Sequence, residues 1–413
     1  MIYPLPAHNL YGNAPVSIEI PDSWEVVVCD YAGADSPAMS YDEIAAAIDR
    51  PIGRLPIREA AKGKKDAIII IDDISRPTPD ELIAKAVIAE LVEAGVPRDK
   101  IRFMAAVGSH RAMSREEFVR KLGEDIVTEF RVYSHNPFFN NTLVGHTDSG
   151  VAIELNSEVV SADFKVAIGN IVPHITVGIA GGAKTIVPGI ASLETIRNLH
   201  SLGEARWDNS IGGFGYATKG AELLGLDFKI DVLLNKDGDV AKLYCGDVNR
   251  LVNENIDEIK AFYSTPYEME GDIVIANNYF KPSEPNVAIA YNGIVFCVKK
   301  GGSLVVSAHT PLGAACHYLM GIWGDSGISG PHFKGYPVMA RRLKNYFAFS
   351  TYQDKGTAVT YQSAGEQLKW VHKWEQILAE VGTEPKKLVI FPHATVGYYG
   401  EDGNIEKKPS PKA

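Results

Sequence analysis

The sequence predicts an α/β protein of two domains, each with a mainly parallel β-sheet flanked by helices. Short runs rich in β-branched residues, such as 66–73, alternate with longer segments of helical periodicity, which is typical of such sheets. The 413 residues also exceed the usual span of one hydrophobic core. We place the expected active site in the cleft between the two domains.

The first domain is expected to alternate strands with helices. Its strands are expected at 66–73, 101–107 and 163–172, and its helices at 80–94 and 190–201. The first of these helices has apolar residues at helical spacing and stops at Gly95 and Pro97, a usual helix exit. The last strand leads into a glycine-rich loop.

A second alternation begins near residue 271 and indicates a second domain. Its strands are expected at 272–277, 303–308 and 387–391, and its helices at about 285–300 and 363–381. The stretch 228–263 is expected to end the first domain, so we place the boundary near residue 268. The expected domains are 1–268, which carries the motifs described below, and 269–413, which closes over the substrate.

The composition argues against several classes of protein. With 41 basic and 51 acidic residues, the formal charge of −10 argues against nucleic-acid binding, which needs clustered Lys and Arg. The four cysteines lie far apart, which fits reduced thiols. We find no leader pattern and no run of roughly 18 apolar residues, so we expect a cytoplasmic protein without membrane association.

Three motifs each come just after an expected strand, at 73–79, 108–111 and 174–189. Ligands of open α/β sheets bind at the carboxyl ends of the strands. We therefore expect the three loops to converge on one composite site.

The first motif, Asp73-Ile-Ser75-Arg76-Pro-Thr-Pro, combines an acid with an arginine on proline-stiffened backbone. An arginine fork suits bidentate capture of a carboxylate or phosphate, with the acid fixing the arginine or a ribose hydroxyl. The alternative is that these side chains cap the helix that begins at residue 80 and form a salt bridge there.

His110 and His174 belong to the second and third motifs. An imidazole just after a strand can act as a general base, although a lone histidine there is more often structural. The expected convergence of the two histidines favours a functional role for both.

Lys184 lies in the stretch Gly181-Gly182-Ala-Lys184-Thr, which is followed by Pro188-Gly189. The glycines let backbone approach a ligand closely, and the N-terminus of the next helix can hold an anion. The phosphate-loop signature fails in register, because only one residue separates the second glycine from the lysine. Phosphate binding, Schiff-base formation and a covalent cofactor tether all stay open as roles of this lysine.

His200 lies at the end of the expected helix 190–201. It is either a surface residue near a helix C-terminus, where positive charge is favourable, or a metal ligand. Because no second His or Cys lies three or four residues away, we do not expect a metal site made by the protein alone.

These motifs, in this order and spacing, resemble the nickel-pincer lactate racemase family. The resemblance is close over the N-terminal two-thirds and looser in the second half. It implies an isomerase, a racemase or epimerase of a 2-hydroxy acid, with a nickel-pincer nucleotide (a pyridinium thioamide/thiocarboxylate mononucleotide) made by dedicated accessory enzymes. It also implies that Lys184 bears this cofactor through a thioamide and that His200 is the protein ligand of nickel.

The resemblance implies roles for further residues. One of His110 and His174 would deprotonate the hydroxyl while hydride moves from C2 to the cofactor, and the other would return the proton after the 2-keto acid has rotated. Arg76 would clamp the substrate carboxylate. The expected cofactor contacts, besides Lys184, are Asp73, Ser75, Gly181, Gly182, Pro188 and Gly189.

The second half departs from the family pattern. Where lactate racemases carry Gln and Lys on a helix facing the substrate, this chain has Ile289 and Asn292, so we expect a 2-hydroxy acid other than lactate. Trp374 matches a family tryptophan near the site, although a core aromatic at helical spacing is the alternative.

Two other functions stay open at this point. One is a phosphate- or nucleotide-binding protein without catalysis, which would use the Gly181–Lys184 loop as an anion cradle. The other is a metal-dependent hydrolase built from His110, His174 and His200, in which a bound ion activates water.

Overall fold

The computed structural model describes residues 1–174, 178–201, 215–283, 293–313, 315–319, 342–352, 368–400 and 405. The chain divides into a central unit, Asp35–Ile259, and a terminal unit, Met1–Ala34 with Lys260–Ala413. This division differs from the expected domains 1–268 and 269–413, because the first 34 residues lie with the C-terminal part of the chain.

Strand pairing explains why the N-terminal residues join the terminal unit. Strand β3 (Glu25–Val28) pairs in parallel with β18 (Lys387–Phe391) at the edge of a sheet. Strands β1 (Ile2–Leu5) and β2 (Val16–Glu19) form an antiparallel pair beside that sheet. Pairing between opposite ends of a chain leaves no trace in local periodicity, so the sequence pattern did not reveal it.

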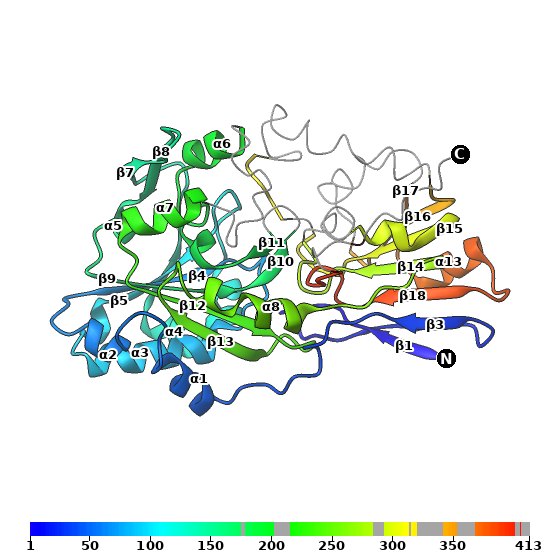
Figure 1. Cartoon of the computed structure of the whole chain (residues 1–413), viewed down its shortest axis with the longest axis horizontal. Helices are drawn as coiled ribbons and strands as arrows, with labels where there is room; N and C mark the ends of the chain where they lie inside the picture. Colours follow the sequence, from blue (N-terminus) through cyan, green and yellow to red (C-terminus); the bar gives the residue numbers. More distant parts are fainter. Residues whose placement is uncertain are drawn as a thin grey trace. The chain divides into compact units, whose positions relative to one another are not determined.

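The central unit is built on a six-stranded sheet (Figure 1). In spatial order its strands are β13 (Val240–Gly246), β12 (Phe228–Leu234), β9 (Phe164–Asn170), β4 (Ala67–Asp72), β5 (Ile101–Ala106) and β6 (Arg131–Ser134). All neighbours pair in parallel except β12 and β13. Ile69, which is fully buried, lies opposite Phe103 of β5 and Val166 of β9, as expected of a central strand covered on both faces.

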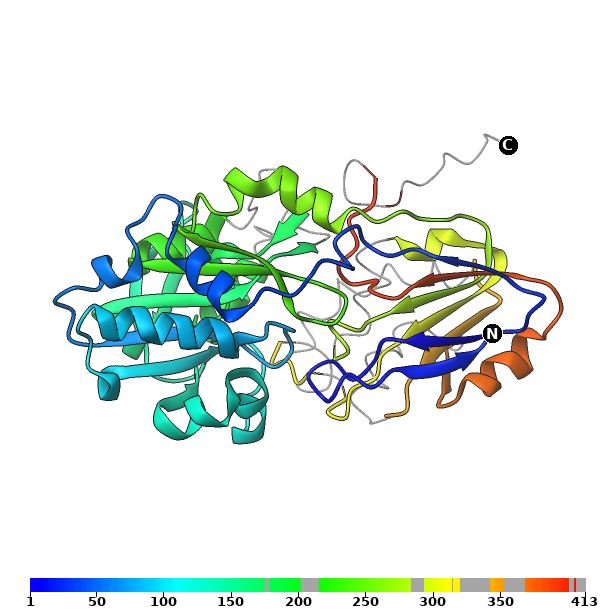
Figure 2. The same ribbon diagram turned by 90° about the horizontal axis from the view of Figure 1, so that it is seen from below.

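Helices α1 to α4 lie together along one face of the central sheet (Figures 1 and 2). The helices of this part of the chain are α1 (Tyr41–Ile48), α2 (Ile57–Ala60), α3 (Asp80–Glu93), α4 (Arg115–Glu129), α5 (Ser157–Val160), α6 (Leu193–Ser201), α7 (Gly215–Leu224) and α8 (Ile256–Tyr263). Its short 3₁₀ turns are η1 (Arg98–Lys100), η2 (Gly182–Thr185) and η3 (Asn253–Asn255). Two antiparallel pairs complete it: β7 (Asn141–His146) with β8 (Ala152–Asn156), and β10 (Val172–His174) with β11 (Gly178–Ala180).

The terminal unit has a second six-stranded sheet, in which every described pairing is parallel. Its strands, in spatial order, are β17 (Leu368–Val371), β16 (Asn345–Phe349), β15 (Val298–Ser307), β14 (Gly271–Asn277), β18 and β3. Alternate residues of β14 enter two hydrophobic cores, with Val274 on one face and Ile275 on the other. The hairpin β1–β2 and helix α13 (Trp374–Val381) cover the Ile275 face.

The structure confirms the α/β class with mainly parallel, helix-flanked sheets, but two expected helices are wrong in part. Within the expected helix 285–300, Ile294–Cys297 is a 3₁₀ turn (η4) and β15 starts at Val298. Within the expected helix 363–381, residues Leu368–Val371 pair with β16 as an edge strand, so the helix begins at Trp374. Among the described residues, no helix is both long and apolar enough to cross a membrane.

Candidate active site

Three adjacent strands of the central sheet bring the predicted motifs to one edge. Strands β9, β4 and β5 are neighbours and parallel, so their carboxyl ends meet at the same side of the sheet. The loop that follows β4 carries Asp73, and the loop that follows β5 carries His110. The expected convergence of these two loops is confirmed, because the two side chains are in contact.

Asp73 and His110 form a buried pair. The Nδ1 atom of His110 lies 2.7 Å from Oδ2 of Asp73, and their side chains are 14% and 6% exposed. Oδ1 of the same carboxylate accepts the amide N–H of Ser75 at 3.0 Å and its hydroxyl. Burial alone would raise the pKa of Asp73, but the charge and hydrogen bond of His110, with Arg76 and Ser75, hold that pKa below its usual value. Asp73 is therefore an ionised orienting group for the imidazole.

Arg76 presents its guanidinium beside this pair. Its amide donates to the carbonyl oxygen of Asp73 at 2.9 Å, and Nη1 donates to the hydroxyl of Ser75 at 3.1 Å. The residue that precedes α3 is Pro79, which makes no side-chain capping bond, so the alternative in which Asp73 or Arg76 caps this helix is not observed. A half-buried arginine next to a histidine that is paired with a carboxylate is well placed to bind an anionic group.

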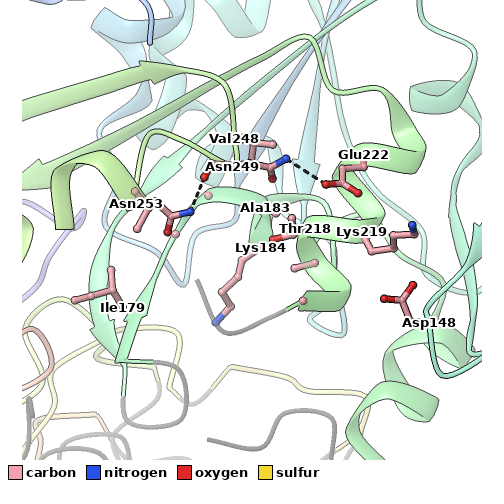
Figure 3. A pocket seen from close by; sticks show the side chains of 15 residues that line it. Asp148, Ile179, Ala183, Lys184, Thr218, Lys219, Glu222, Val248, Asn249 and Asn253 are labelled. Carbon is pink, nitrogen blue, oxygen red and sulfur yellow. Dashed lines mark hydrogen bonds between the residues drawn. The ribbon is translucent and has the colours of Figure 1, made fainter. Parts of the chain in front are cut away.

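Lys184 lies on the turn η2 and lines a pocket of about 360 Å³ (Figure 3). Its side chain extends away from the turn (Figure 3). Lys219 and Thr218 of α7 lie nearby on the lining, as do Asn249 and Asn253. The other lining residues are Asp148, Ile179, Gly181, Gly182, Ala183, Gly215, Ala217, Glu222, Val248 and Val252.

Glycines shape the loop of Lys184. A Cβ atom on Gly189 would lie 2.1 Å from the carbonyl oxygen of Thr185, and one on Gly181 would lie 2.8 Å from Cγ1 of Ile171. Gly182 has a φ of +57°, in the left-handed region that favours glycine. The predicted glycines are therefore needed for the path of the backbone itself.

A backbone hydrogen bond links the loop of Lys184 to the loop of His110. The amide of Gly108 donates to the carbonyl oxygen of Gly189 at 2.8 Å, and Pro188 packs against Gly108. The Asp73, His110 and Lys184 loops thus form one connected assembly at the edge of the central sheet.

Sequence analysis missed a set of buried charges below these loops. The ammonium of Lys121 contacts the carboxylates of Asp72 and Asp80, and that of Lys229 lies 2.6 Å from Asp231. Of these five side chains, all except that of Asp72 are at most 1% exposed. One signal was available: Lys121 lies three residues after Phe118 and directly before Leu122, on the apolar face of its helix.

His135 is a buried histidine with a structural role. Its Nε2 lies 2.9 Å from the carbonyl oxygen of Ala191, and its Nδ1 lies 3.1 Å from the amide nitrogen of Asn156. Burial lowers its pKa to about 4, with the Ala191 bond acting in the opposite direction. The neutral ring thus ties the loop before α6 to strand β8.

The remaining predicted residues fall into two groups. His174 ends β10 and His200 lies in α6, but the side chains of both lie outside the described part of the structure. Ile289 and Asn292 lie outside the described residues altogether. Trp374 is 3% exposed, belongs to a hydrophobic core of the terminal unit, and donates from Nε1 to the carbonyl oxygen of Glu19 at 2.7 Å. This position favours the core role of Trp374 over contact with substrate.

Sequence comparison finds lactate racemases among the relatives of this chain. Residues 11–212 match the family model of the lactate racemase N-terminal domain. Lactate racemase from Lactiplantibacillus plantarum is 31% identical over 283 residues, 65% of this chain and 65% of the relative. The match therefore spans slightly less than two thirds of that relative's length. Lactate racemase from Thermoanaerobacterium thermosaccharolyticum is 29% identical over 318 residues, 72% of this chain and 73% of the relative.

Two solved structures share the fold. The lactate racemase apoprotein from Thermoanaerobacterium thermosaccharolyticum gives a TM-score of 0.69 at 20% identity and covers 97% of this chain and 100% of that chain. A protein from Thermotoga maritima gives a TM-score of 0.64 at 16% identity, with 90% and 99% covered. The chain thus shares the fold of the lactate racemase apoprotein, and its sequence is similar to lactate racemases and, over residues 11–212, to the lactate racemase N-terminal domain.

Proposed function

We propose that this protein is a racemase or epimerase of a 2-hydroxy acid and that it works with a nickel-pincer nucleotide attached to Lys184. The observation that carries the proposal is the buried Asp73–His110 pair, which lies beside Arg76 and is linked by backbone to the loop of Lys184. Homology to lactate racemases supports the reaction class. An oriented acid–base pair favours catalysis over simple phosphate or nucleotide binding.

The pocket beside Lys184 fits a mononucleotide. Its volume of about 360 Å³ lies within the range of small-molecule sites, roughly 300–1,000 Å³. Lys184 would hold the cofactor covalently, Gly181 and Gly182 would admit it close to the backbone, Lys219 is suited to its phosphate, and His200 would bind nickel. When bound, this group supplies the carbon that accepts hydride from C2 of the substrate and returns it.

His110 would exchange the proton of the substrate hydroxyl. Because the ionised Asp73 accepts the hydrogen bond of Nδ1–H, Nε2 is the ring nitrogen that takes the substrate proton. The carboxylate then offsets the positive charge that develops on the ring. His174 would play the same part for the opposite enantiomer, because the two enantiomers present their hydroxyls to opposite sides.

Arg76 would bind the substrate carboxylate as a bidentate fork. Its bonds to Ser75 and the charge of Asp73 hold the guanidinium beside His110, where a carboxylate next to the reacting hydroxyl belongs. A substrate anchored in this way is aligned at C2 before hydride moves.

The substrate we propose is larger than lactate. Ile289 and Asn292 replace the Gln and Lys of lactate racemases, so the wall beyond C3 would be uncharged. That wall suits a polyol sugar acid bound by Asn292 or an apolar side chain against Ile289. The check is a panel of D- and L-2-hydroxy acids with chiral analysis of the products, and lactate with the highest kcat/KM would refute the substrate assignment.

The experiment that tests the cofactor is intact-mass analysis of protein made with and without the accessory enzymes of cofactor synthesis. We expect an added mass that peptide mapping places on Lys184, nickel that is retained with it, and racemisation only in the loaded sample. Nickel bound without an adduct, together with hydrolytic activity, would instead indicate a metal-dependent hydrolase.

A further inference from the structure

Lys121 of α4 lies directly under the loop that carries Arg76. Its side chain is 0% exposed, and Nζ contacts the carboxylate of Asp72, the carbonyl oxygen of Arg76 at 3.3 Å and Oδ2 of Asp80 at 3.0 Å. A lysine ammonium has three N–H donors. Two of them bond to Asp72 and to the carbonyl oxygen of Arg76, and the carboxylate of Asp80 forms an ion pair with the same ammonium.

The three residues that Lys121 contacts mark the start, the middle and the end of one loop. Asp72 is the last residue of β4, Arg76 lies in the loop, and Asp80 is the first residue of α3. A single cation thus holds the loop at three points, each four residues from the next. Between the first two points lies Asp73, the partner of His110.

A second buried lysine supports the loop of Lys184 in a similar way. Lys229 of β12 donates to Oδ1 of Asp231 at 2.6 Å and to the carbonyl oxygen of Ile230 at 2.8 Å. The other carboxylate oxygen, Oδ2, accepts the amide of Gly182 at 2.7 Å. The amide that opens the turn η2 is therefore fixed by a charged acceptor from the sheet beneath.

The two groups of charges influence one another. Burial raises the pKa of Asp80, with the charges of Lys121 and Lys229 lowering it and that of Asp72 raising it further. Burial also raises the pKa of Asp231, against Lys229, and the charge of Asp72 adds to that rise. These charges therefore act as one network under both functional loops.

Stability alone does not account for such a network. Buried ion pairs are often no more stabilising than apolar side chains of the same volume, because both charges must leave water. Here the charges reach the two loops that carry Asp73, Arg76 and Lys184, because Lys121 donates to the carbonyl oxygen of Arg76 and Asp231 accepts the amide of Gly182.

We propose that Lys121 and Asp231 are positioning residues of the active site. Lys121 sets the shape of the loop that presents Arg76 and Asp73, and Asp231 sets the turn that presents Lys184. The inference rests on the proposed function for the roles of these loops. The proposal assigns a different role to each residue: Lys121 supports substrate binding, and Asp231 supports attachment of the cofactor.

The test compares Lys121→Met and Asp231→Asn with a matched control, Lys165→Met. Lys165 is also buried, on β9, but its Nζ donates to the carbonyl oxygen of Ala162, at the amino end of the sheet. The readouts are amide hydrogen exchange of the cofactor-free protein, adduct yield by intact mass, and KM and kcat of the loaded enzyme.

For Lys121→Met we expect faster exchange confined to 73–79, an unchanged adduct yield and a KM raised roughly tenfold or more, the effect of about one lost charge-assisted contact. For Asp231→Asn we expect faster exchange confined to 182–189, a lower adduct yield and an unchanged KM in the loaded fraction. Lys165→Met should change none of these. If Lys121→Met does not fold, Lys121→Met with Asp72→Asn removes both charges of the pair and should fold with the same pattern.

Equal effects of Lys121→Met and Lys165→Met, or exchange that rises evenly over the whole central unit, would overturn the proposal. Unchanged exchange and KM in a folded Lys121 variant would do the same. Hydrogen exchange needs neither cofactor nor substrate, so it tests the positioning role independently of the proposed function. A wild type that carries no adduct and racemises no substrate would refute the proposed function, but the exchange data would still decide about positioning.

Discussion

Replacing Asp73 with asparagine isolates the charge of the buried acid–base pair. Asparagine keeps the size of the side chain and an oxygen that can accept the hydrogen bond of His110, which lies 2.7 Å away in the wild type. It removes the negative charge that faces the imidazole. The loop should keep its shape through the bond from the Arg76 amide to the carbonyl oxygen of residue 73, although the single side-chain oxygen of asparagine cannot serve both His110 and the amide of Ser75.

The expected loss follows from the strength of this contact. A hydrogen bond to a charged partner contributes about 1.5–3 kcal/mol. At about 1.4 kcal/mol for each factor of ten, its loss from the transition state lowers kcat roughly 10- to 150-fold. The substrate KM should stay nearly unchanged, because the carboxylate clamp is Arg76.

The assay is the initial rate of racemisation in both directions, measured on enzyme with equal adduct on Lys184. Asp66→Asn is the matched control, since Asp66 precedes β4 at the opposite end of the strand and pairs with Arg102 at 3.0 Å. The control should retain wild-type kcat. A kcat for Asp73→Asn within twofold of the wild type would refute the role of the Asp73–His110 pair.

The effect of Asp73→Asn on the free energy of unfolding should also depend on pH. The pKa of Asp73 lies below its usual value in the folded protein despite burial, because His110, Arg76 and Ser75 favour the ionised form. Its contribution to the free energy of unfolding is therefore present above the unfolded pKa of about 3.9 and is lost as pH falls through the folded value. The stability difference between wild type and Asp73→Asn should shrink as pH falls below about 4; a difference that grows instead would contradict this assignment.

Three further predictions concern the cofactor, the acid–base groups and the loop. Lys184→Ala should fold and lose both adduct and nickel, whereas His200→Ala should keep the adduct and lose nickel, as intact mass and metal analysis will show. Alanine at either proposed acid–base histidine should lower turnover about 10²–10⁴-fold in both directions; near wild-type turnover would make that histidine structural. Gly189→Ala should cost roughly 1–3 kcal/mol of unfolding free energy through overpacking, measured by thermal melting. Gly215→Ala, whose Cβ would meet nothing within 4 Å, should melt like the wild type.

The part of the site that the sequence predicted depends on a simple property of parallel sheets. The carboxyl ends of adjacent parallel strands share one edge, so motifs after β4 and β5 had to meet, and Asp73 and His110 do. Strand β4 was predictable because its isoleucines are buried on both faces. Gly181 and Gly189 were predicted to admit a ligand close to the backbone, whereas the structure shows that a Cβ atom on either would meet the protein itself.

The supporting charges were not predictable from local patterns. Lysine is usually exposed, and the burial of Lys121 depends on Asp72 and Asp80, which come from a different strand and helix. Strand β3 was missed for a similar reason, because its partner β18 lies at the other end of the chain. The strand Leu368–Val371 precedes a true helix, and its residues extended the apparent helical period.

Isotope retention at C2 tests the central claim most directly. A single enantiomer of the preferred 2-hydroxy acid, deuterated at C2, is incubated in ordinary water with enzyme that carries the adduct on Lys184. The proposed hydride transfer and return predicts that the inverted product keeps deuterium at C2, because only the hydroxyl proton passes through His110 and His174. Inverted product with hydrogen from solvent at C2 would show that a proton is removed from carbon and would contradict the account.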